Sequence, residues 1–321
     1  MITPQKLSPG DEIRIITPSS SWARVGGFEA NLKSKEKLES WGLKVTFGRH
    51  IETSDIQDSL PIQDRVDDIH EAFADPNIKA ILSLIGGFTS NELLPYLDYE
   101  LIRNNPKIIC GFSDFTALAN AITAKTGLVT YYGPAYVTLK MSDEQGQYQD
   151  DCFKKVLFGS EATKLVASKT WSSDAWYDPT ASRNYHDNQW QVYSEGHIKG
   201  QTVGGNLDTF NLLAGTPYQP ELDDKVWFFE FSEEMHGIEL SRYLAQLLQI
   251  SQKPKALLLG RFPKENKMTK ELLHYILDKF PIFKQLPVIY DVNFGHAQPI
   301  LTLPLGGLVE IETKTKSITT L

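Results

Sequence analysis

The sequence predicts a two-domain α/β protein, with a helix-covered parallel sheet first and a mixed α/β unit second. Between Glu12 and Tyr132, short apolar segments alternate with helical patterns, as they do in parallel sheets. The chain has 321 residues, and single hydrophobic cores stop growing at roughly 250–300 residues. We therefore predict domains over residues 1–160 and 200–321, joined by a segment over residues 161–199.

The first domain is predicted from apolar runs separated by helical stretches. Asp75-Pro76 ends one helix and Thr126-Gly127 ends another, because proline and glycine stop helices. Ligands of such folds bind at the carboxyl ends of the strands. The strands are predicted at Ile13–Ile16, Lys44–Phe47, Ala80–Ile85, Ile108–Gly111 and Val129–Tyr132, and the helices at Gly27–Trp41, Pro61–Ala74, Ser90–Leu97 and Phe115–Lys125.

The joining segment is irregular in pattern and rich in aromatic residues. Long aperiodic loops are often lids or binding surfaces, and aromatic rings among polar groups suit stacking on a flat ligand. The alternative is that these rings fill the joint between the domains. The aromatic residues are Trp171, Trp176, Tyr177, Tyr185, Trp190 and Tyr193.

The second domain is predicted to have a mixed α/β topology. A very apolar run ends at Glu230, helical and strand-like segments then alternate, and Gly306-Gly307 marks a turn between two late strands. The predicted strands are Val226–Glu230, Ala256–Leu259, Val288–Val292, Leu301–Pro304 and Val309–Ile311, and the helices are Ile238–Leu248 and Thr269–Phe280.

Composition excludes several classes of function. A formal net charge of -8 does not favour binding to nucleic-acid polymers or anionic membranes. The first residues hold no apolar signal core, and no charge-free run approaches the roughly 18 residues that span a bilayer, so we expect a cytoplasmic protein. Cys110 and Cys152 form no disulfide framework, and no Cys/His cluster has zinc-site spacing, so we expect no metal.

The segment Gly111-Phe112-Ser113-Asp114 is the most informative motif in the chain. It places a serine at a sharp turn between a buried strand and a helix. Such a turn exposes the hydroxyl and leaves neighbouring backbone N–H groups free to stabilise an oxyanion, as an acyl-transfer nucleophile requires. The alternative is an ordinary serine that caps the helix.

A second loop is expected at the same edge of the sheet. Gly86 and Gly87 follow the predicted strand at Ala80–Ile85, and Ser113 follows the next strand along the chain. We therefore expect a backbone N–H of this glycine pair beside Ser113. Together with the amide of Asp114 it would form a pair of oxyanion donors. The alternative is a Gly-Gly turn selected only for its backbone angles.

A serine nucleophile needs a base, and the base needs an acid that orients it. Of seven histidines, His296 stands out because it lies in a loop directly after a buried strand. Glu230 ends the most apolar strand of the second half, where a carboxylate needs a hydrogen-bonding partner. Spacing alone does not show that Ser113, Glu230 and His296 meet.

Several separate motifs follow one another along the chain: Leu7-Ser8-Pro9-Gly10-Asp11, Thr17-Pro18-Ser19-Ser20, Gly86-Gly87-Phe88-Thr89-Ser90-Asn91, Gly111-Phe112-Ser113-Asp114, Gly204-Gly205-Asn206-Leu207, Gly215-Thr216-Pro217-Tyr218 and Phe294-Gly295-His296. In these motifs and their order the chain resembles the LD-carboxypeptidase family of serine peptidases over essentially its whole length. The resemblance implies a Rossmann-like first domain, a swivelling β/β/α-like second domain, no metal or organic cofactor, and a homodimer. It also assigns Ser113 as nucleophile, His296 as base, Glu230 as acid, and the amides of Gly87 and Asp114 as oxyanion donors. Family members commonly have Asp after the acid, whereas this chain has Phe231.

Three further segments are Leu93-Leu94-Pro95-Tyr96-Leu97-Asp98-Tyr99, Asn105-Pro106-Lys107-Ile108 and Lys125-Thr126-Gly127-Leu128-Val129-Thr130-Tyr131. In these segments and in its Trp-rich joining segment, the chain is more similar to the microcin C self-immunity branch of the family than to the enzymes of peptidoglycan recycling. That branch hydrolyses the amide between an acidic aminoacyl group and a nucleotide-like moiety. We therefore expect Trp176 or Trp190 to stack on the base, and Gly86 and Asn91 to contact substrate. The alternatives are a muramoyltetrapeptide LD-carboxypeptidase and, in another class, a non-catalytic protein that binds a nucleotide or sugar.

Overall fold

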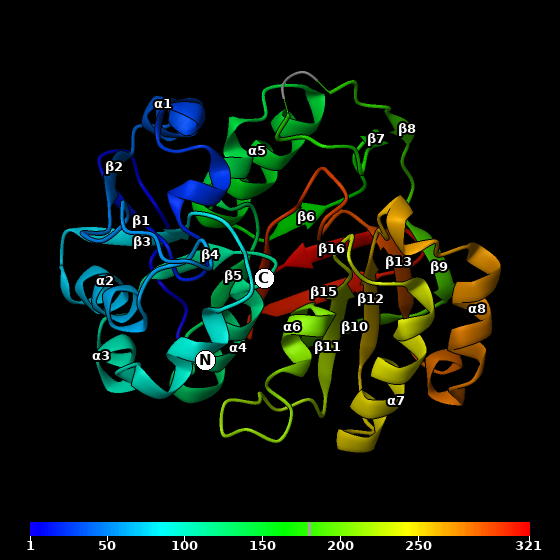
Figure 1. Ribbon diagram of the computed structural model, residues 1–321. Helices are drawn as coiled ribbons and strands as arrows, with labels where there is room; N and C mark the ends of the chain where they lie inside the picture. The colour runs from blue at the N-terminus through cyan, green and yellow to red at the C-terminus, as the bar shows by residue number, and fades with distance from the viewer. Residues whose placement is uncertain (179–180) are drawn as a thin grey trace.

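The protein is built around two sheets that stand side by side (Figure 1). The computed structural model describes residues 1–178 and 181–321. One sheet has six strands in the order β14-β5-β4-β3-β1-β2, and the other has eight in the order β6-β16-β15-β10-β11-β12-β13-β9. Within the described residues, no helix has the length and apolar character that a membrane span requires.

The first sheet confirms the predicted parallel arrangement. Strands β3, β4 and β5 are fully or largely buried, β1 is partly buried, and the edge strand β2 is exposed or half-buried. The predicted helix at Ser90–Leu97 is a 3-10 helix over Ser90–Tyr96, because Pro95 lies within it. The parallel strands are β1 (Glu12–Ile16), β2 (Lys44–Phe47), β3 (Ile78–Ser83), β4 (Ile108–Gly111) and β5 (Thr130–Tyr132), and the helices are α1 (Leu32–Ser40), α2 (Ile62–Ala74), α3 (Tyr99–Asn104), α4 (Phe115–Thr126) and α5 (Glu144–Leu157).

One late strand lies in the first sheet rather than the second. The strand predicted at Leu301–Pro304 is β14 (Leu303–Leu305), and it pairs antiparallel with β5, with Leu303 opposite Tyr132. Apolar alternation identifies a strand but not its neighbour, so the sequence did not show that this strand joins the first sheet. The chain therefore returns to the first sheet before it completes the second.

The second sheet confirms the predicted mixed topology. Four parallel strands form its centre, and antiparallel strands flank them on both sides. The parallel strands are β10 (His197–Asn206), β11 (Lys225–Glu230), β12 (Ala256–Gly260) and β13 (Val288–Val292); the flanking strands are β6 (Thr163–Leu165), β9 (Gln191–Ser194), β15 (Leu308–Glu312) and β16 (Ser317–Thr320); and the helices are α6 (Leu207–Asn211), α7 (Leu240–Ile250) and α8 (Lys270–Asp278).

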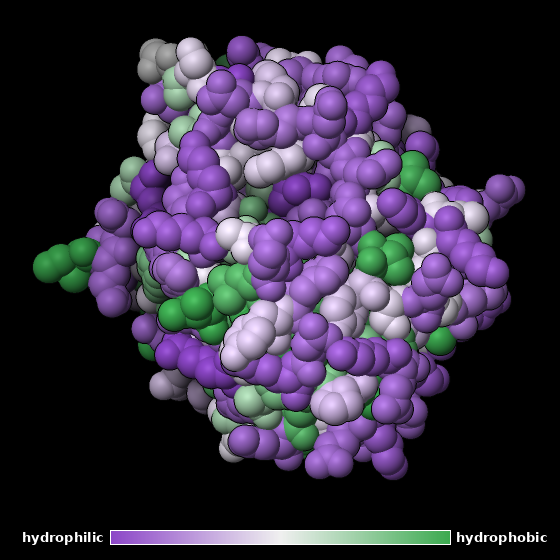
Figure 2. Space-filling view, turned by 90° about the vertical axis from the view of Figure 1, so that its right-hand side faces the viewer, coloured by the Kyte–Doolittle hydropathy of each residue, from purple (hydrophilic) through white to green (hydrophobic). Residues whose placement is uncertain are grey.

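The surface on the α8 side is mostly hydrophilic. Figure 2 shows its hydrophobic residues in small separate patches. Most large apolar side chains lie instead in two buried clusters, one of which draws residues from both sheets. In that shared cluster the rings of Tyr132 and Phe228 lie 5.6 Å apart, and those of Phe228 and Phe294 lie 5.5 Å apart. The two sheets are therefore joined by packed aromatic rings.

The joining segment is more ordered than its sequence pattern predicted. Strands β6 and β9 are part of the second sheet, and β7 (Thr170–Trp171) pairs with β8 (His186–Asp187). Residues 179–180 of the predicted 161–199 segment lie outside the described residues. Hydrogen bonding to flanking strands thus orders a stretch that has no periodicity of its own.

Trp190 is a core residue, so its predicted role in stacking on a ligand was wrong. Its side chain is 0% exposed, and its indole N–H donates to Oδ1 of Asn293 at 2.9 Å. The same Oδ1 accepts from Asn188 Nδ2 at 2.8 Å and from the amide of Ser168 at 3.1 Å. The alternative interpretation, that aromatic residues fill the joint between the domains, holds for this tryptophan.

We expect Trp190→Phe to lower the free energy of unfolding by about 1–3 kcal/mol, because it removes buried volume and a buried hydrogen bond. Chemical denaturation measures this loss. Trp176→Phe is the matched control, because Trp176 is only half-buried and should affect ligand affinity more than stability. Unchanged stability of the Trp190 variant together with weakened ligand binding would contradict the assignment.

Candidate active site

Ser113 lies on a strained turn between β4 and α4. Its φ angle is 61°, a left-handed conformation that is uncommon for residues other than glycine. The turn is closed by hydrogen bonds from the amides of Phe115 and Thr116 to the carbonyls of Phe112 and Ser113, at 3.2 and 2.9 Å. This geometry leaves the serine half-buried, at the wall of a cavity.

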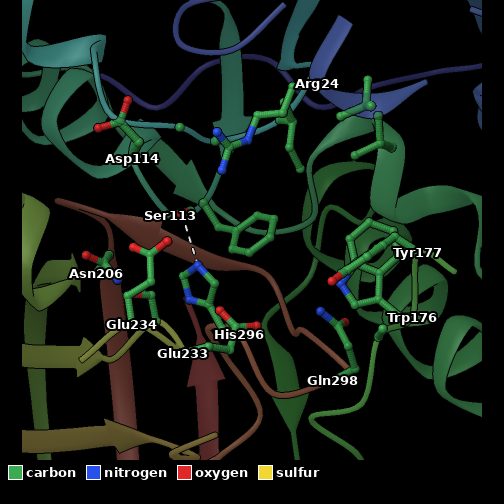
Figure 3. Close-up of a pocket in the computed structure, with 18 of the residues that line it drawn as sticks. Arg24, Ser113, Asp114, Trp176, Tyr177, Asn206, Glu233, Glu234, His296 and Gln298 are labelled. Carbon is green, nitrogen blue, oxygen red and sulfur yellow. Dashed lines mark hydrogen bonds between the residues drawn. The ribbon is translucent and has the colours of Figure 1, made fainter. Parts of the chain in front are cut away.

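The cavity has a volume of about 890 Å³ and is lined by residues of both domains. Figure 3 shows Ser113 and His296 joined by a hydrogen bond at the cavity, with Arg24 on one side of them and Glu233 and Glu234 on the other. A cavity of this size accommodates a drug-sized ligand.

The hydrogen bonds of His296 link Ser113 to Glu230. Nε2 of His296 lies 3.0 Å from Oγ of Ser113, and Nδ1 lies 2.8 Å from Oε2 of Glu230. A carboxylate can only accept, so Nδ1 carries a proton, and in the neutral imidazole Nε2 accepts from the serine hydroxyl. This is the arrangement in which a histidine can take a proton from a serine.

Glu230 is 1% exposed and is held by both domains. Tyr132 at the end of β5 donates its hydroxyl to Oε1 at 2.7 Å, while His296 contacts the other oxygen. Burial acts to raise the pKa of Glu230, but the charge of His296 and these hydrogen bonds hold the pKa below its ordinary value. Glu230 therefore remains a carboxylate, and the sequence analysis did not identify Tyr132 as its partner.

Only glycine fits beside this carboxylate at position 295. A Cβ there would lie 2.4 Å from Oε2 of Glu230, and the φ angle of Gly295 is +101°. The loop that carries His296 can therefore pass close enough for Nδ1 to reach Glu230.

Phe231, the departure from the family pattern, is a packing residue. It is 1% exposed, and its ring lies 5.4 Å from the ring of Phe262 and 6.4 Å from that of Tyr243. Its side chain packs in the apolar cluster of the second domain. Tyr132, rather than the residue after the acid, supplies the additional hydrogen bond to Glu230.

The pKa of His296 is raised above its ordinary value. Burial acts to lower it, but the Glu230 carboxylate outweighs burial, and Glu233 and Glu234 add to the rise. In the part of the chain that is described, neither Glu233 nor Glu234 makes a hydrogen bond or a salt bridge. Their charges therefore act on the imidazole and on whatever enters the cavity.

Two backbone N–H groups beside Ser113 have no hydrogen-bond acceptor among the described residues. They belong to Gly87 and Asp114, which both line the cavity. An atom placed as Cβ on Gly86 would lie 3.4 Å from the amide nitrogen of Asp114, so the two loops are in close contact. Free donors on adjacent loops suit the binding of a negative oxygen.

The side chain of Asp114 ties three loops together. Its carboxylate accepts from Oγ of Ser19 at 2.5 Å and from the amide of Ser90 at 2.9 Å. Oγ of Ser90 donates back to the carbonyl of Asp114 at 2.6 Å. The loops after β1 and β3 are thus fixed against the turn that carries Ser113. Both serines occur in motifs identified in the sequence, although their role was not predicted.

Comparison with known proteins identifies the family. The model of the LD-carboxypeptidase N-terminal domain matches residues 13–133, and the model of the C-terminal domain matches residues 199–311. The chain belongs to the LD-carboxypeptidase family of serine peptidases.

Relatives extend over almost the whole chain. A putative carboxypeptidase of Treponema pallidum is 38% identical, over 98% of this chain and 93% of its own. The microcin C7 self-immunity protein MccF of Escherichia coli is 33% identical, over 97% of this chain and 93% of its own. The crystal structure of an MccF-like protein from Bacillus anthracis has a TM-score of 0.96 at 40% identity, covering 100% of this chain and 99% of that one.

Not all of the other residues predicted to contact substrate in this LD-carboxypeptidase family member line the cavity. Gly86 and Trp176 line the cavity. Asn91 does not: it lies in the 3-10 helix after the Gly86-Gly87 loop, so its predicted contact with substrate was wrong. Arg24, Asn206 and Gln298 line the cavity but were not predicted as contact residues, although Asn206 belongs to the Gly204-Gly205-Asn206-Leu207 motif.

We expect Gly86→Ala to lower kcat/KM by about a hundredfold, because small displacements of reacting groups have effects of this size. The new Cβ would lie 2.8 Å from both Cβ and Oγ of Ser113, so the serine must move. Gly127→Ala is the control: its Cβ would meet nothing within 4 Å, but its φ of +75° strains the end of α4. That variant should lose about 1 kcal/mol of stability and keep its activity. Full activity of the Gly86 variant would refute the arrangement.

Replacing both Glu233 and Glu234 by Gln should shift the pH profile of kcat/KM to lower pH. The base must be neutral to act, so activity rises with pH through the pKa of His296. Removing two carboxylates lowers that pKa, which is raised in the native protein. The shift should shrink in 1 M salt, which screens exposed charges. Glu265→Gln, also in the cavity lining, is the control expected to leave the profile unchanged.

Proposed function

We propose that this protein hydrolyses the amide of an aminoacyl-nucleotide of microcin C type, with Ser113, His296 and Glu230 as its catalytic triad. The observation that carries the proposal is the pair of hydrogen bonds from His296, at 3.0 Å to Ser113 and 2.8 Å to Glu230. Acyl transfer explains three features together: the positive φ angle of the serine, the oriented imidazole and the buried carboxylate.

The reaction proceeds through an acyl-enzyme. Nε2 of His296 takes the proton of Ser113 as Oγ attacks the substrate carbonyl, and Glu230 stabilises the imidazolium that forms. The amides of Gly87 and Asp114 donate to the oxyanion. His296 then protonates the departing nitrogen, and water, deprotonated by the same imidazole, releases the acid and restores Ser113.

The aromatic wall of the cavity supports a nucleotide as the leaving group. Trp176 and Tyr177 both line the cavity, with their rings 5.7 Å apart and nearly perpendicular. Nζ of Lys140 lies 5.8 Å from the centre of the Trp176 ring. Structures of MccF, at 31% identity and a TM-score of 0.89 in one case, contain glutamyl sulfamoyl guanosine and aspartyl sulfamoyl adenosine. We infer that Trp176 stacks on the base.

Charge favours the orientation of the acyl group. Glu233 and Glu234 face His296, so the α-ammonium group beside the scissile carbonyl is expected on their side. Arg24 stands on another wall, and its guanidinium contacts the Phe88 ring but no carboxylate of the described residues. Arg24 is therefore available to an anionic group of the substrate.

The same arginine supports a second candidate, a muramoyltetrapeptide LD-carboxypeptidase. A carboxypeptidase must bind the terminal carboxylate of its substrate, and a free guanidinium is suited to that group. The murein tetrapeptide carboxypeptidase of Pseudomonas aeruginosa is 25% identical over 94% of this chain and 92% of its own. A non-catalytic protein that binds a nucleotide or sugar is the alternative from another class. Cytoplasmic location and a homodimer stay predictions.

Ser113→Ala should lower kcat by at least about a thousandfold, because loss of the nucleophile removes covalent catalysis. The test offers one preparation an aminoacyl sulfamoyl adenosine and a tetrapeptide ending in D-alanine, and products are quantified by mass spectrometry. Ser142→Ala, at an exposed serine, is the control that should keep full activity.

The outcomes separate the three candidates. Turnover of the nucleotide by the wild type but not by the Ser113 variant supports the proposal. Release of D-alanine without turnover of the nucleotide supports the second candidate. Tight binding of either compound without any product indicates the binding protein. Native turnover by the Ser113 variant would refute the triad.

A further inference from the structure

Gln298 has a buried carboxamide that faces the cavity. The side chain is 1% exposed and lines the cavity, two residues after His296. Among the residues that the structure describes, neither Oε1 nor Nε2 of Gln298 has a hydrogen-bond partner. Buried amide groups in proteins are almost always hydrogen-bonded. A free donor and a free acceptor on one such group therefore point to a ligand.

The backbone holds this carboxamide in place. The amide of Gln298 donates to the carbonyl of Ser172 at 2.8 Å, and the carbonyl of Gln298 accepts from the amide of Ser172 at 3.0 Å. Ser172 begins the stretch that leads to Trp176 and Tyr177. Gln298 is thus joined on one side to the loop of His296 and on the other to the aromatic wall.

The position of Gln298 fits one part of the proposed substrate. Figure 3 shows its side chain on the side of the cavity that carries Trp176 and Tyr177. Trp176 offers a face on which a flat ring can stack. A carboxamide beside such a face can hydrogen-bond to the edge of the stacked ring.

We propose that Gln298 recognises the edge of adenine and makes the enzyme selective for adenine over guanine nucleotides. The inference rests on the proposed function. Adenine presents an amino donor next to a ring-nitrogen acceptor, which match Oε1 and Nε2 of a glutamine. Guanine presents two acceptors, O6 and N7, on the corresponding edge, so Oε1 would stay buried and unpaired. That unpaired group is the source of selectivity.

The test measures binding by calorimetry in the Ser113→Ala protein, which should hold substrates uncleaved. The probes are one aminoacyl group on sulfamoyl adenosine, on sulfamoyl guanosine, and on the sulfamoyl riboside of purine, which lacks the amino group. We expect the adenosine compound to bind about tenfold to a hundredfold more tightly than the other two. Adding Gln298→Leu should reduce these ratios to about one, because leucine forms no hydrogen bond with the edge of the base.

Two further variants sharpen the result. Gln298→Glu should weaken binding of the adenosine compound but keep its preference over the purine riboside, because a carboxylate accepts from the amino group of adenine and cannot donate to its ring nitrogen. Gln285→Leu, at an exposed glutamine outside the cavity lining, should leave the ratios unchanged. A preference for adenosine over the purine riboside that persists in the Gln298→Glu variant is not produced by loss of folding.

Failure of this inference and failure of the proposed function are distinguishable. Equal binding of the three compounds, or ratios that persist with Gln298→Leu, would overturn the adenine assignment and leave the hydrolase intact. No binding of any nucleotide, with turnover of the tetrapeptide by the wild type, would overturn both. In that case Gln298 would be expected to pair with a backbone amide of the peptide.

Discussion

The hydrogen bonds to one buried carboxylate hold the site together. Glu230 ends a strand of the second sheet, and Tyr132 ends a strand of the first, yet Tyr132 donates to Glu230 at 2.7 Å. A buried carboxylate is costly unless such partners are present. If the sheets separated, Glu230 would lose Tyr132. The orientation of His296 by Glu230 therefore depends on the docking of the two domains.

Two further hydrogen bonds also join the first domain to the second. The amide of Asn206 donates to Oγ1 of Thr116 at 2.9 Å, and Nδ2 of Asn120 donates to the carbonyl of Gly204 at 2.8 Å. Both bonds join α4, which starts just after Ser113, to β10 of the second sheet. Ser113 and Glu230 are thus held by elements that contact each other directly.

Local features of the site were accessible from the sequence, and long-range ones were not. The turn at Ser113 follows from a strand, a glycine and a helix start within a few residues, so it could be predicted. Glu230 and His296 lie 66 residues apart, and Ser113 and His296 lie 183 apart. Their meeting followed only from the family resemblance. Trp190 was misassigned because the polar residues around it in the sequence do not indicate whether its side chain is buried. Tyr132 was missed because its partner Glu230 lies on the other sheet.

The return of β14 to the first sheet has a consequence for how this molecule can be divided. Leu303–Leu305 covers the edge of β5, including Tyr132, although more than a hundred and fifty residues separate the two strands along the chain. A fragment ending before the second sheet would leave that edge open, with unpaired backbone groups ready to join another chain. The halves are consequently interdependent in folding, and a recombinant N-terminal piece would be an aggregating fragment rather than a miniature of the whole.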